Sequence, residues 1–224
     1  DWSSDVCSSD LRLAAAAALR AGSGIVWCAT PGASAAEPGP GELAEVVGHP
    51  LPVGPSGSLD DLAVDHLLAD ALGARTRFGA LVLGPGLGTG SEVAGAVRRL
   101  LAAVSVPVLL DADGLTALAG DLDPLRDRAA AGHRTVLTPH EGEFARLAGP
   151  VGPDRVAAAR RLAADSGATV LLKGPGTVVS DPDGSAAIST PGGPWLATAG
   201  TGDVLAGILG SLLARGLAPR RAAA

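Results

Sequence analysis

Residues 190–216, TPGGPWLATAGTGDVLAGILGSLLARG, decide the fold, because a glycine-rich turn runs directly into a helix there. Gly216 is a stop signal for this helix, and Pro219 follows it. The glycines therefore lie at a helix N-terminus, where unpaired N–H groups and the helix dipole favour an anion such as phosphate. Apolar residues at helical spacing predict a buried stripe on the helix, formed by Val204, Leu205, Ile208, Leu209, Leu212 and Leu213.

Asp203 stands in the first turn of this helix and has two interpretations. It can cap the helix as a structural carboxylate. It can also act as a base that takes a proton from a hydroxyl group, while neighbouring N–H groups stabilise charge on a transferring phosphoryl group. Gly193, Gly200 and Gly202 precede it, and a simple cap does not need so open a backbone. We therefore favour the catalytic interpretation.

Composition limits the classes of protein to which the chain can belong. At 224 residues it can bury one sizeable core, so a single α/β domain is the default expectation. The formal net charge of −6 argues against a nucleic-acid surface and against binding to anionic membranes. The two cysteines, Cys7 and Cys28, suggest neither a disulfide framework nor a zinc site, and no apolar run reaches the roughly 18 residues of a membrane span. We expect a cytoplasmic protein.

Short apolar strands alternate with helices, a pattern typical of a mostly parallel sheet with helices on both faces. We expect strands at 24–30, 80–83, 107–110, 134–137 and 169–172, and a hairpin at 177–180 and 186–190. Helices are predicted at 11–21, 58–72, 91–104, 115–119, 143–147 and 154–166, the second of them capped by Ser58. Residues 42–47 fit a short helix or a strand.

The first ten residues, DWSSDVCSSD, differ from the rest of the chain, because they are polar and show no periodicity. We expect residues 1–10 to be a disordered tail or sequence foreign to the native gene product, outside the folded domain.

Strand after strand ends in glycine or a polar residue, and ligands bind beyond such ends in an open α/β sheet. The run GPGLG at 84–88 can be a plain turn, or it can let the backbone approach a ligand closely. Asp111 and Asp113 can cap a helix or hold Mg²⁺, usually through water. His140 can be structural, or with Glu141 and Glu143 close by it can form a polar pocket that orients substrate hydroxyls or a metal–phosphate unit. Lys173 can be solvated or face a phosphate.

These strand ends, with residues 200–203, are predicted to line one crevice. Trp195 can be a core anchor or a lid over a base, and the sequence leaves both interpretations open.

Five motifs carry a family resemblance, and they occur in the family's order: LVLGPGLG (81–88), PVLLDADGL (107–115), LTPHEGEFARL (137–147), VLLKGPGTVVSDPDG (170–184) and the opening stretch (190–216). Together they resemble the ADP-dependent NAD(P)H-hydrate dehydratase family, whose members adopt a ribokinase-like fold. The resemblance extends over roughly residues 11–216. The motif GPWLATAGTGDVLAG is much more specific to this family than the GxGD turn that all ribokinase-like kinases share.

The resemblance implies a lyase that repairs nicotinamide cofactors. Such an enzyme dehydrates the 6S hydrate of NADH or NADPH, with ADP as co-substrate and Mg²⁺ as metal ion, and gives AMP and phosphate. It implies Asp203 as the catalytic base, with substrate contacts from Asp203, His140 and Gly86 or Gly88. By matching position it assigns the nucleotide to Lys173, Gly174, Pro175, Gly176, Thr177, Gly200, Thr201 and Gly202. It assigns no metal ligand.

The sequence also departs from the family. Residues 1–10 stand where relatives have a first strand and a substrate-binding alanine, and relatives continue with further helices beyond the position of Ala224. We therefore expect a single domain over 11–224 that is truncated at both ends, with low stability and weak activity. The resemblance also suggests a homo-oligomer, a tetramer in relatives.

Two other functions remain open. The first is a ribokinase-like kinase for a small alcohol such as a vitamin precursor, which shares the glycine-rich turn and the aspartate. The second is a non-catalytic nucleotide-binding remnant, which would bind ADP without turnover. All three functions have small-molecule partners.

Overall fold

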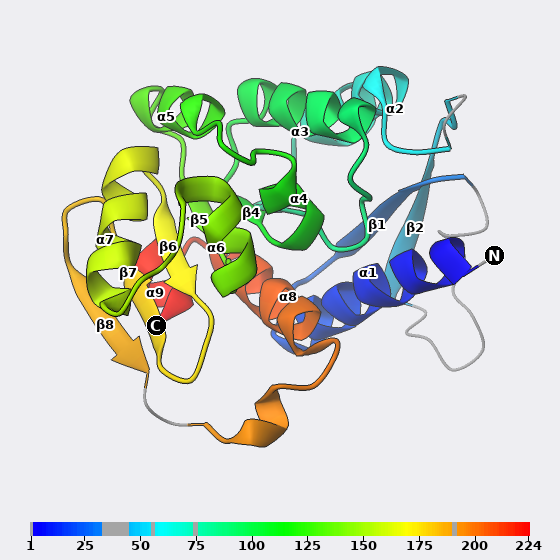
Figure 1. Cartoon of the computed structure of the whole chain (residues 1–224). Helices are drawn as coiled ribbons and strands as arrows, with labels where there is room; N and C mark the ends of the chain where they lie inside the picture. The colour runs from blue at the N-terminus through cyan, green and yellow to red at the C-terminus, as the bar shows by residue number, and fades with distance from the viewer. Residues whose placement is uncertain (1, 33–44, 55–56, 74–75, 190–191) are drawn as a thin grey trace.

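The structure is a computed structural model that describes residues 2–32, 45–54, 57–73, 76–189 and 192–224. Within these residues the strands form two sheets (Figure 1). The larger sheet has the order β3-β4-β5-β6-β7-β8, with bounds Leu81–Leu83, Val108–Leu110, Thr135–Leu137, Thr169–Leu172, Thr177–Ser180 and Ala186–Ser189. Its first four strands are parallel, and β7 and β8 extend it as an antiparallel hairpin. The α/β class, the mostly parallel sheet and the hairpin are confirmed.

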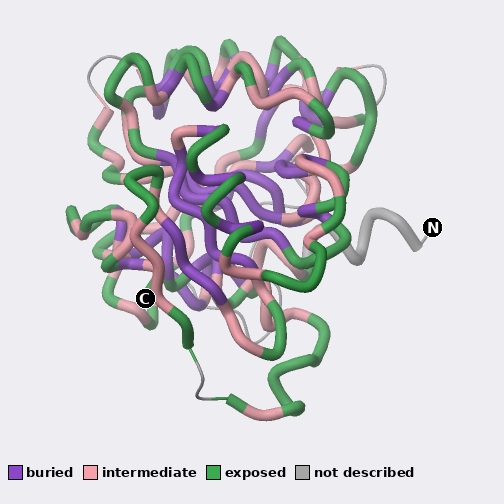
Figure 2. Tube along the Cα trace, turned by 60° about the vertical axis from the view of Figure 1, so that its left-hand side comes forward, coloured by how far each residue is buried: buried purple, intermediate pink, exposed green. Residues whose placement is uncertain are grey.

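The larger sheet is covered on both faces, as Figure 2 shows by the buried strands at its centre. In β4, Val108 and Leu110 point into the larger apolar core, whereas Leu109 points into a second core on the opposite face. The larger core includes side chains of α3 (Ser91–Ala103), α4 (Ala112–Thr116), α5 (Asp123–Ala130), α6 (Glu141–Ala148) and α7 (Arg155–Ser166). The second core is formed with α8 (Thr201–Ala214) and α9 (Pro219–Ala223).

Several elements begin at other residues than the sequence predicts. Helix α1 spans Trp2–Arg20, so it starts nine residues before the predicted Leu11. Its Ser- and Asp-rich first turns have low helix propensity, but they extend an alanine-rich helix that is already nucleated. Asp60, not Ser58, caps α2 (Asp61–Leu67), because its Oδ1 accepts the Ala63 N–H at 2.9 Å. The helix then continues as a π-helical turn, η1 (Leu68–Leu72).

The predicted strand at 24–30 forms as β1 (Val26–Pro31), but it lies outside the larger sheet. It pairs in parallel with β2 (Val46–Leu51), so a strand is the correct choice for the described part of 42–47, while residues 42–44 lie outside the described residues. The short helices α5 and α9 are not predicted. None of the described helices is long and apolar enough to cross a membrane.

A largely apolar cavity of ≈ 410 Å³, partly open to solvent, lies between β1 and β3. Helices α1 and α8 border it, and its lining includes Ala15, Cys28, Val82 and Ser211. Strand β3 is hydrogen-bonded to the β4 segment on one side. The Leu81 N–H donates to Pro107 O at 2.9 Å, and Leu83 O accepts the Asp111 N–H at 3.2 Å. Because hydrogen bonding alternates along a parallel strand, the peptide groups of Val82 face the other way. In the described part of the chain, β3 therefore has no strand partner on its side away from β4, and β1 has none on its side away from β2.

Arg128 fixes the larger sheet to the helices above it. This side chain is only 2% exposed, and it donates to the carbonyls of Leu101, Val104 and Val106 at 2.7, 2.5 and 3.0 Å and to Thr135 Oγ1 at 3.2 Å. Burial lowers the pKa of Arg128 to about 10, which leaves it charged at neutral pH. One guanidinium thus joins the end of α3 to the starts of β4 and β5.

Candidate active site

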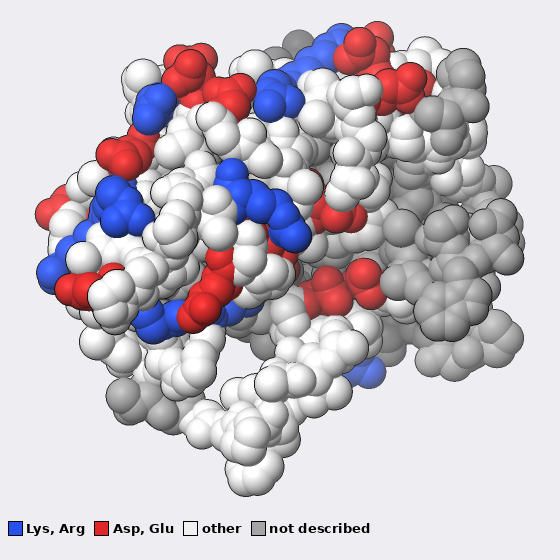
Figure 3. All heavy atoms as spheres, viewed as in Figure 1, with Lys and Arg blue, Asp and Glu red and all other residues white. Residues whose placement is uncertain are grey.

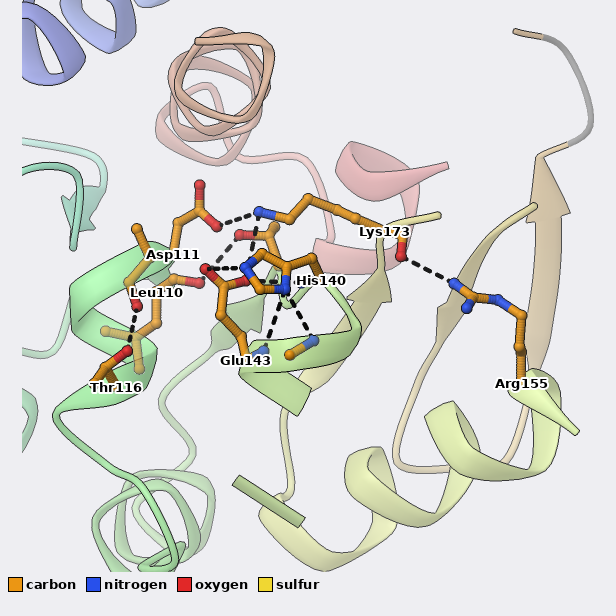
Figure 4. Close-up of polar contacts among 10 residues, drawn as sticks. Leu110, Asp111, Thr116, His140, Glu143, Arg155 and Lys173 are labelled. Atoms are coloured by element: carbon orange, nitrogen blue, oxygen red, sulfur yellow. Dashed lines mark hydrogen bonds and ion pairs between the residues drawn. The ribbon is translucent and has the colours of Figure 1, made fainter. Parts of the chain in front are cut away.

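A lysine and two carboxylates meet at the carboxyl edge of the larger sheet (Figure 4). Asp111 follows β4 and Lys173 follows β6, and the parallel register of β4, β5 and β6 brings their ends together. Lys173 Nζ lies 2.8 Å from Asp111 Oδ1 and 3.7 Å from Glu143 Oε2. Asp111 is 2% exposed and Glu143 6%, so this one ammonium group balances two buried negative charges. The strand ends that the sequence predicts to converge therefore do meet here.

The N-terminus of α8 lies against this cluster. Gly200, at φ 85°, is the N-cap residue, and its left-handed backbone suits glycine. A Cβ placed on Gly202 would lie 3.6 Å from Lys173 Nζ and 3.8 Å from Asp111 Oδ2. The glycine-rich turn therefore brings unpaired helix N–H groups and a lysine to the same place, which suits a phosphate.

Asp203, in the first turn of α8, has an altered acidity. Burial, together with the charges of Asp10 and Asp111, raises its pKa to about 6, against the opposing effect of Lys173. At neutral pH most molecules carry the ionised form, and its affinity for a proton is higher than that of an ordinary carboxylate. These properties suit a general base.

His140 serves the local structure and also borders the site. Its Nδ1 accepts the N–H groups of Gly142 and Glu143 at 2.9 and 3.3 Å, and Glu143 Oε2 accepts the His140 N–H at 2.7 Å. This reciprocal pair is a capping box at the start of α6. The arrangement assigns the ring proton to Nε2, 3.4 Å from Glu143 Oε1. The His140 side chain is 55% exposed, so part of the ring is accessible to a ligand.

The glycine loop after β3 is held against the end of β4. A Cβ on Gly84 would overlap Asp111 O, so the two strand ends approach closely only because residue 84 is glycine. Gly86 and Gly88 both have left-handed φ values, 67° and 82°. The Gly88 N–H donates to Asp113 Oδ2 at 2.8 Å. The sequence offers Asp111 and Asp113 as a possible magnesium pair. In the structure Lys173 contacts Asp111, whereas the Gly88 N–H binds Asp113.

The loop after β6 is supported by a residue that sequence reasoning missed. Arg155 of α7 donates from Nη2 to Lys173 O at 2.9 Å and forms an ion pair with Glu141. A Cβ on Gly174 would overlap the Arg155 guanidinium, so this glycine allows the contact. Thr177 is the first residue of β7 and pairs with Ser189, which fits the strand interpretation. Among the described contacts of this loop, the one near α8 is made by Lys173, whose Nζ lies beside Gly202.

The segment before α8 projects from the body of the molecule, and Figure 3 shows a hollow beside it. Trp195 lies on a short turn, η2 (Pro194–Leu196), and is 78% exposed, so the core-anchor interpretation of this residue is wrong. The Thr201 hydroxyl joins the segment to α8 by donating toward Leu196 O at 2.9 Å. The apolar cavity between the sheets is a different place, lined by none of Asp111, His140, Lys173 and Asp203.

The fold and this site define a class of protein: an α/β domain in which a helix N-terminus, a lysine and a carboxylate meet at the end of a parallel sheet, an arrangement that suits a phosphorylated ligand. The family model described as NAD(P)H-hydrate dehydratase matches residues 10–224. The chain belongs to this family.

Two relatives show how much of a longer protein the chain represents. The bifunctional NAD(P)H-hydrate repair enzyme Nnr of Salinibacter ruber is 46% identical over 214 residues, which are 95% of this chain and 38% of that protein. The ADP-dependent (S)-NAD(P)H-hydrate dehydratase of Neisseria meningitidis serogroup B is 46% identical over 154 residues, 66% of this chain and 52% of that protein. The chain thus spans about half or less of the length of these relatives.

Solved structures confirm the ribokinase-like fold. The ADP/ATP-dependent NAD(P)H-hydrate dehydratase of Bacillus subtilis, co-crystallised with ATP and Mg²⁺, matches with a TM-score of 0.74 at 28% identity, over 98% of this chain and 73% of that chain. A ribokinase-like superfamily protein of Enterococcus faecalis matches in fold, with a TM-score of 0.64 at 22% identity, over 92% of this chain and 67% of that chain.

Proposed function

We propose that this chain catalyses the ADP-dependent dehydration of the 6S hydrate of NADH or NADPH and so restores the normal cofactor. The observation that carries the proposal is Asp203, a carboxylate with a pKa of about 6 at the helix N-terminus beside Lys173. Family membership supplies the substrate class, and the names of both relatives agree with it.

The chemistry needs a phosphorylation step, because hydroxide is a poor leaving group. Asp203 accepts the proton of the hydroxyl on C6 of the hydrated ring while that oxygen forms a bond to the β-phosphorus of ADP. The bond from this phosphorus to the bridging oxygen breaks, and AMP leaves. The ring nitrogen's lone pair then expels phosphate from C6, and loss of a proton from C5 gives the reduced nicotinamide.

The chain's own residues would position the two substrates. The amide groups of residues 200–202 and Lys173 bind the phosphates, and the loop at 173–177 holds the rest of the nucleotide. Gly86, Gly88 and His140 border the hydrated ring. Asp111 Oδ1 faces Lys173, and its Oδ2 lies near Gly202, so Asp111 Oδ2 would help to hold Mg²⁺, which would neutralise charge on the nucleotide phosphates.

The proposal is tested by mixing the chain with hydrated NADH, Mg²⁺ and ADP and following the near-ultraviolet absorbance of reduced nicotinamide. We expect a rise that Asp203→Asn reduces by about 10²–10⁴-fold, the usual effect of removing a general base. Asp165→Asn, an exposed carboxylate on α7, is the matched control and should leave the rate unchanged. An unchanged rate in Asp203→Asn would contradict the assignment of the base.

The alternative functions give different outcomes. With ATP and a small alcohol such as a vitamin precursor added to the mixture, a kinase would leave a stable phosphorylated alcohol, which phosphorus NMR distinguishes from inorganic phosphate. A non-catalytic nucleotide-binding protein would show a higher melting temperature with ADP and no turnover. The motif contexts TPHEGE and GPWLATAGTGD favour the dehydratase over both.

A further inference from the structure

Away from the active site, three metal-binding side chains converge between β2 and the following helix. His49 lies on β2, His66 in the last turn of α2 and Asp70 in the π-helical turn η1. One ring nitrogen of each histidine and one oxygen of Asp70 all lie within 4.8 Å of one another. The proposed dehydratase mechanism uses none of these residues.

The spacing of the three groups is close to that of a metal-bound set. His66 Nε2 is 3.2 Å from Asp70 Oδ2, and the ring centres of His49 and His66 are 5.4 Å apart. Two imidazoles that bind one tetrahedral Zn²⁺ at about 2.0–2.1 Å have ring centres roughly 5 Å apart. An ion could therefore be bound with small side-chain movements.

A second observation points to a missing ligand. Nε2 of His49 is buried and has no hydrogen-bond partner among the described residues. A buried polar atom without a partner costs free energy, and such atoms are rare in folded proteins. The His49 ring cannot easily turn toward water, because it stacks on Trp27 with centroids 4.7 Å apart, and Trp27 packs edge-on against Phe78.

The surrounding charges leave Asp70 available for the two histidines. Asp61 and Asp65, on the same helix, both form ion pairs with Arg99 of α3. Arg77 is engaged with aromatic rings, because its guanidinium lies over the Trp27 ring at 5.3 Å from its centroid. Asp70 has His66 as its ion-pair partner, so its charge already belongs to this cluster.

We propose that His49, His66 and Asp70 form a binding site for Zn²⁺, with water as the fourth ligand. Two imidazoles and one carboxylate are a donor set typical of zinc, whereas Mg²⁺ and Ca²⁺ prefer oxygen ligands alone. The ion links β2, in the small sheet, to the helix that packs beside it. The site therefore ties down the part of the molecule that lies outside the larger sheet.

The test uses the full chain after removal of metals with a chelator. Titration with Zn²⁺, followed by calorimetry, should show one tight equivalent, and Co²⁺ should give the intense visible absorption of a tetrahedral site. His49→Gln, His66→Gln and Asp70→Asn should each weaken Zn²⁺ binding by about tenfold or more, since each removes one of three protein ligands. His133→Gln, which removes a histidine far from the cluster in the sequence, is the matched control and should bind as the unaltered chain does.

Thermal melts provide the second readout. Zn²⁺ should raise the melting temperature of the unaltered chain and of His133→Gln, but not that of the three cluster variants. His49→Gln could destabilise the fold by disturbing the Trp27 stack. Asp70→Asn still tests the site in that case, because the Asp70 side chain is 49% exposed and its replacement should not disturb the fold. Unchanged Zn²⁺ affinity in Asp70→Asn and His66→Gln would overturn the proposal. Loss of binding in Asp111→Asn instead would place the ion in the active site and also overturn it.

Discussion

Asp203 is placed where its negative charge is opposed by its surroundings. Burial and the carboxylates of Asp10 and Asp111 raise its pKa, whereas Lys173 and a backbone hydrogen bond favour the ionised form. Lys173 also neutralises Asp111 and Glu143, so one ammonium group determines the charge balance of the whole site. When a phosphate enters, this lysine gains a further anionic partner, and the proton affinity of Asp203 changes with it.

The pH dependence of activity and stability should reflect this environment. Turnover should fall as the pH decreases through about 6, because a protonated Asp203 cannot act as a base. Stability should change in the opposite direction. The folded pKa lies above the unfolded value, so the stability from proton binding is present at low pH and is lost as the pH rises through about 6. After discounting for solvent screening, we expect about 1 kcal/mol.

This prediction is checked by a pH–rate profile and by denaturant unfolding at several pH values. Asp203→Asn should remove the stability change in this window and should be at least as stable as the unaltered chain at pH 7. Identical pH dependence of unfolding in both proteins would show that Asp203 does not titrate with a raised pKa.

Sequence reasoning found some of these site residues and missed others for a physical reason. Asp203 and Lys173 follow directly from turns at the ends of elements, and such local patterns are visible in the sequence. Glu143 was recognised only as a polar neighbour of His140, although the capping-box spacing could have identified its contact with the His140 N–H. Arg155 left no signal, because it binds a main-chain oxygen of Lys173, eighteen positions away in the chain.

At the scale of elements, the contact between α1 and α8 depends on a single glycine. A Cβ on Gly207 of α8 would overlap the carbonyl oxygen of Ala14 and lie 3.0 Å from the Ala17 Cβ in α1. Because both neighbours belong to a packed helix, the two helices would have to separate to make room. The active-site end of α8 would move with them.

A matched pair of variants tests this contact. Gly207→Ala should lower the free energy of unfolding by about 1–3 kcal/mol, the usual cost of overpacking. Gly95→Ala, in α3, should raise it by about 0.5–1 kcal/mol, because a Cβ there meets nothing within 4 Å and alanine favours the helix. Chemical denaturation of both variants measures the difference. An equal change in the free energy of unfolding for Gly207→Ala and Gly95→Ala would mean that the helices are not in tight contact at Gly207.

The elements themselves were predictable to different degrees. Strands of the larger sheet were found because they are short apolar runs that end in turns, and those runs are buried on both faces. The start of α2 was misplaced, because Ser58 and Asp60 are both good N-caps and only packing selects between them. Helices α5 and α9 were missed, although each has a proline in its first turn, a known start signal.

At the scale of the whole molecule, the small β1–β2 sheet should open more easily than the larger one. The three residues of β4 are fully buried, whereas β2 contains exposed and partly exposed positions and only one buried residue. Such regions open by local fluctuations of low free energy. Hydrogen exchange should therefore be faster for the β1 and β2 amides than for those of β4 and β5. Equal protection in both sheets would contradict this view, and added Zn²⁺ should slow exchange in β2, α2 and η1, which carry the three proposed ligands.

The division into two sheets could not be predicted. Periodicity shows that a segment is a strand, but it does not name the strand's neighbour, and the strand predicted at 24–30 is expected to join a single sheet. Residues 1–10 stand where the family resemblance gives relatives a first strand, and in the structure residues 2–10 belong to α1. Between β1 and β3 the structure has a cavity rather than a strand.

The hollow between β1 and β3 also gives the protein a place that a small apolar molecule could occupy. Its lining is largely apolar, and it is partly open to solvent. A molecule that fills it would bind the folded chain and not the unfolded one, so it would stabilise the fold by mass action. Melting temperatures measured with and without a small aromatic hydrocarbon should therefore show whether the chain has a stabilising site far from its phosphate-binding helix.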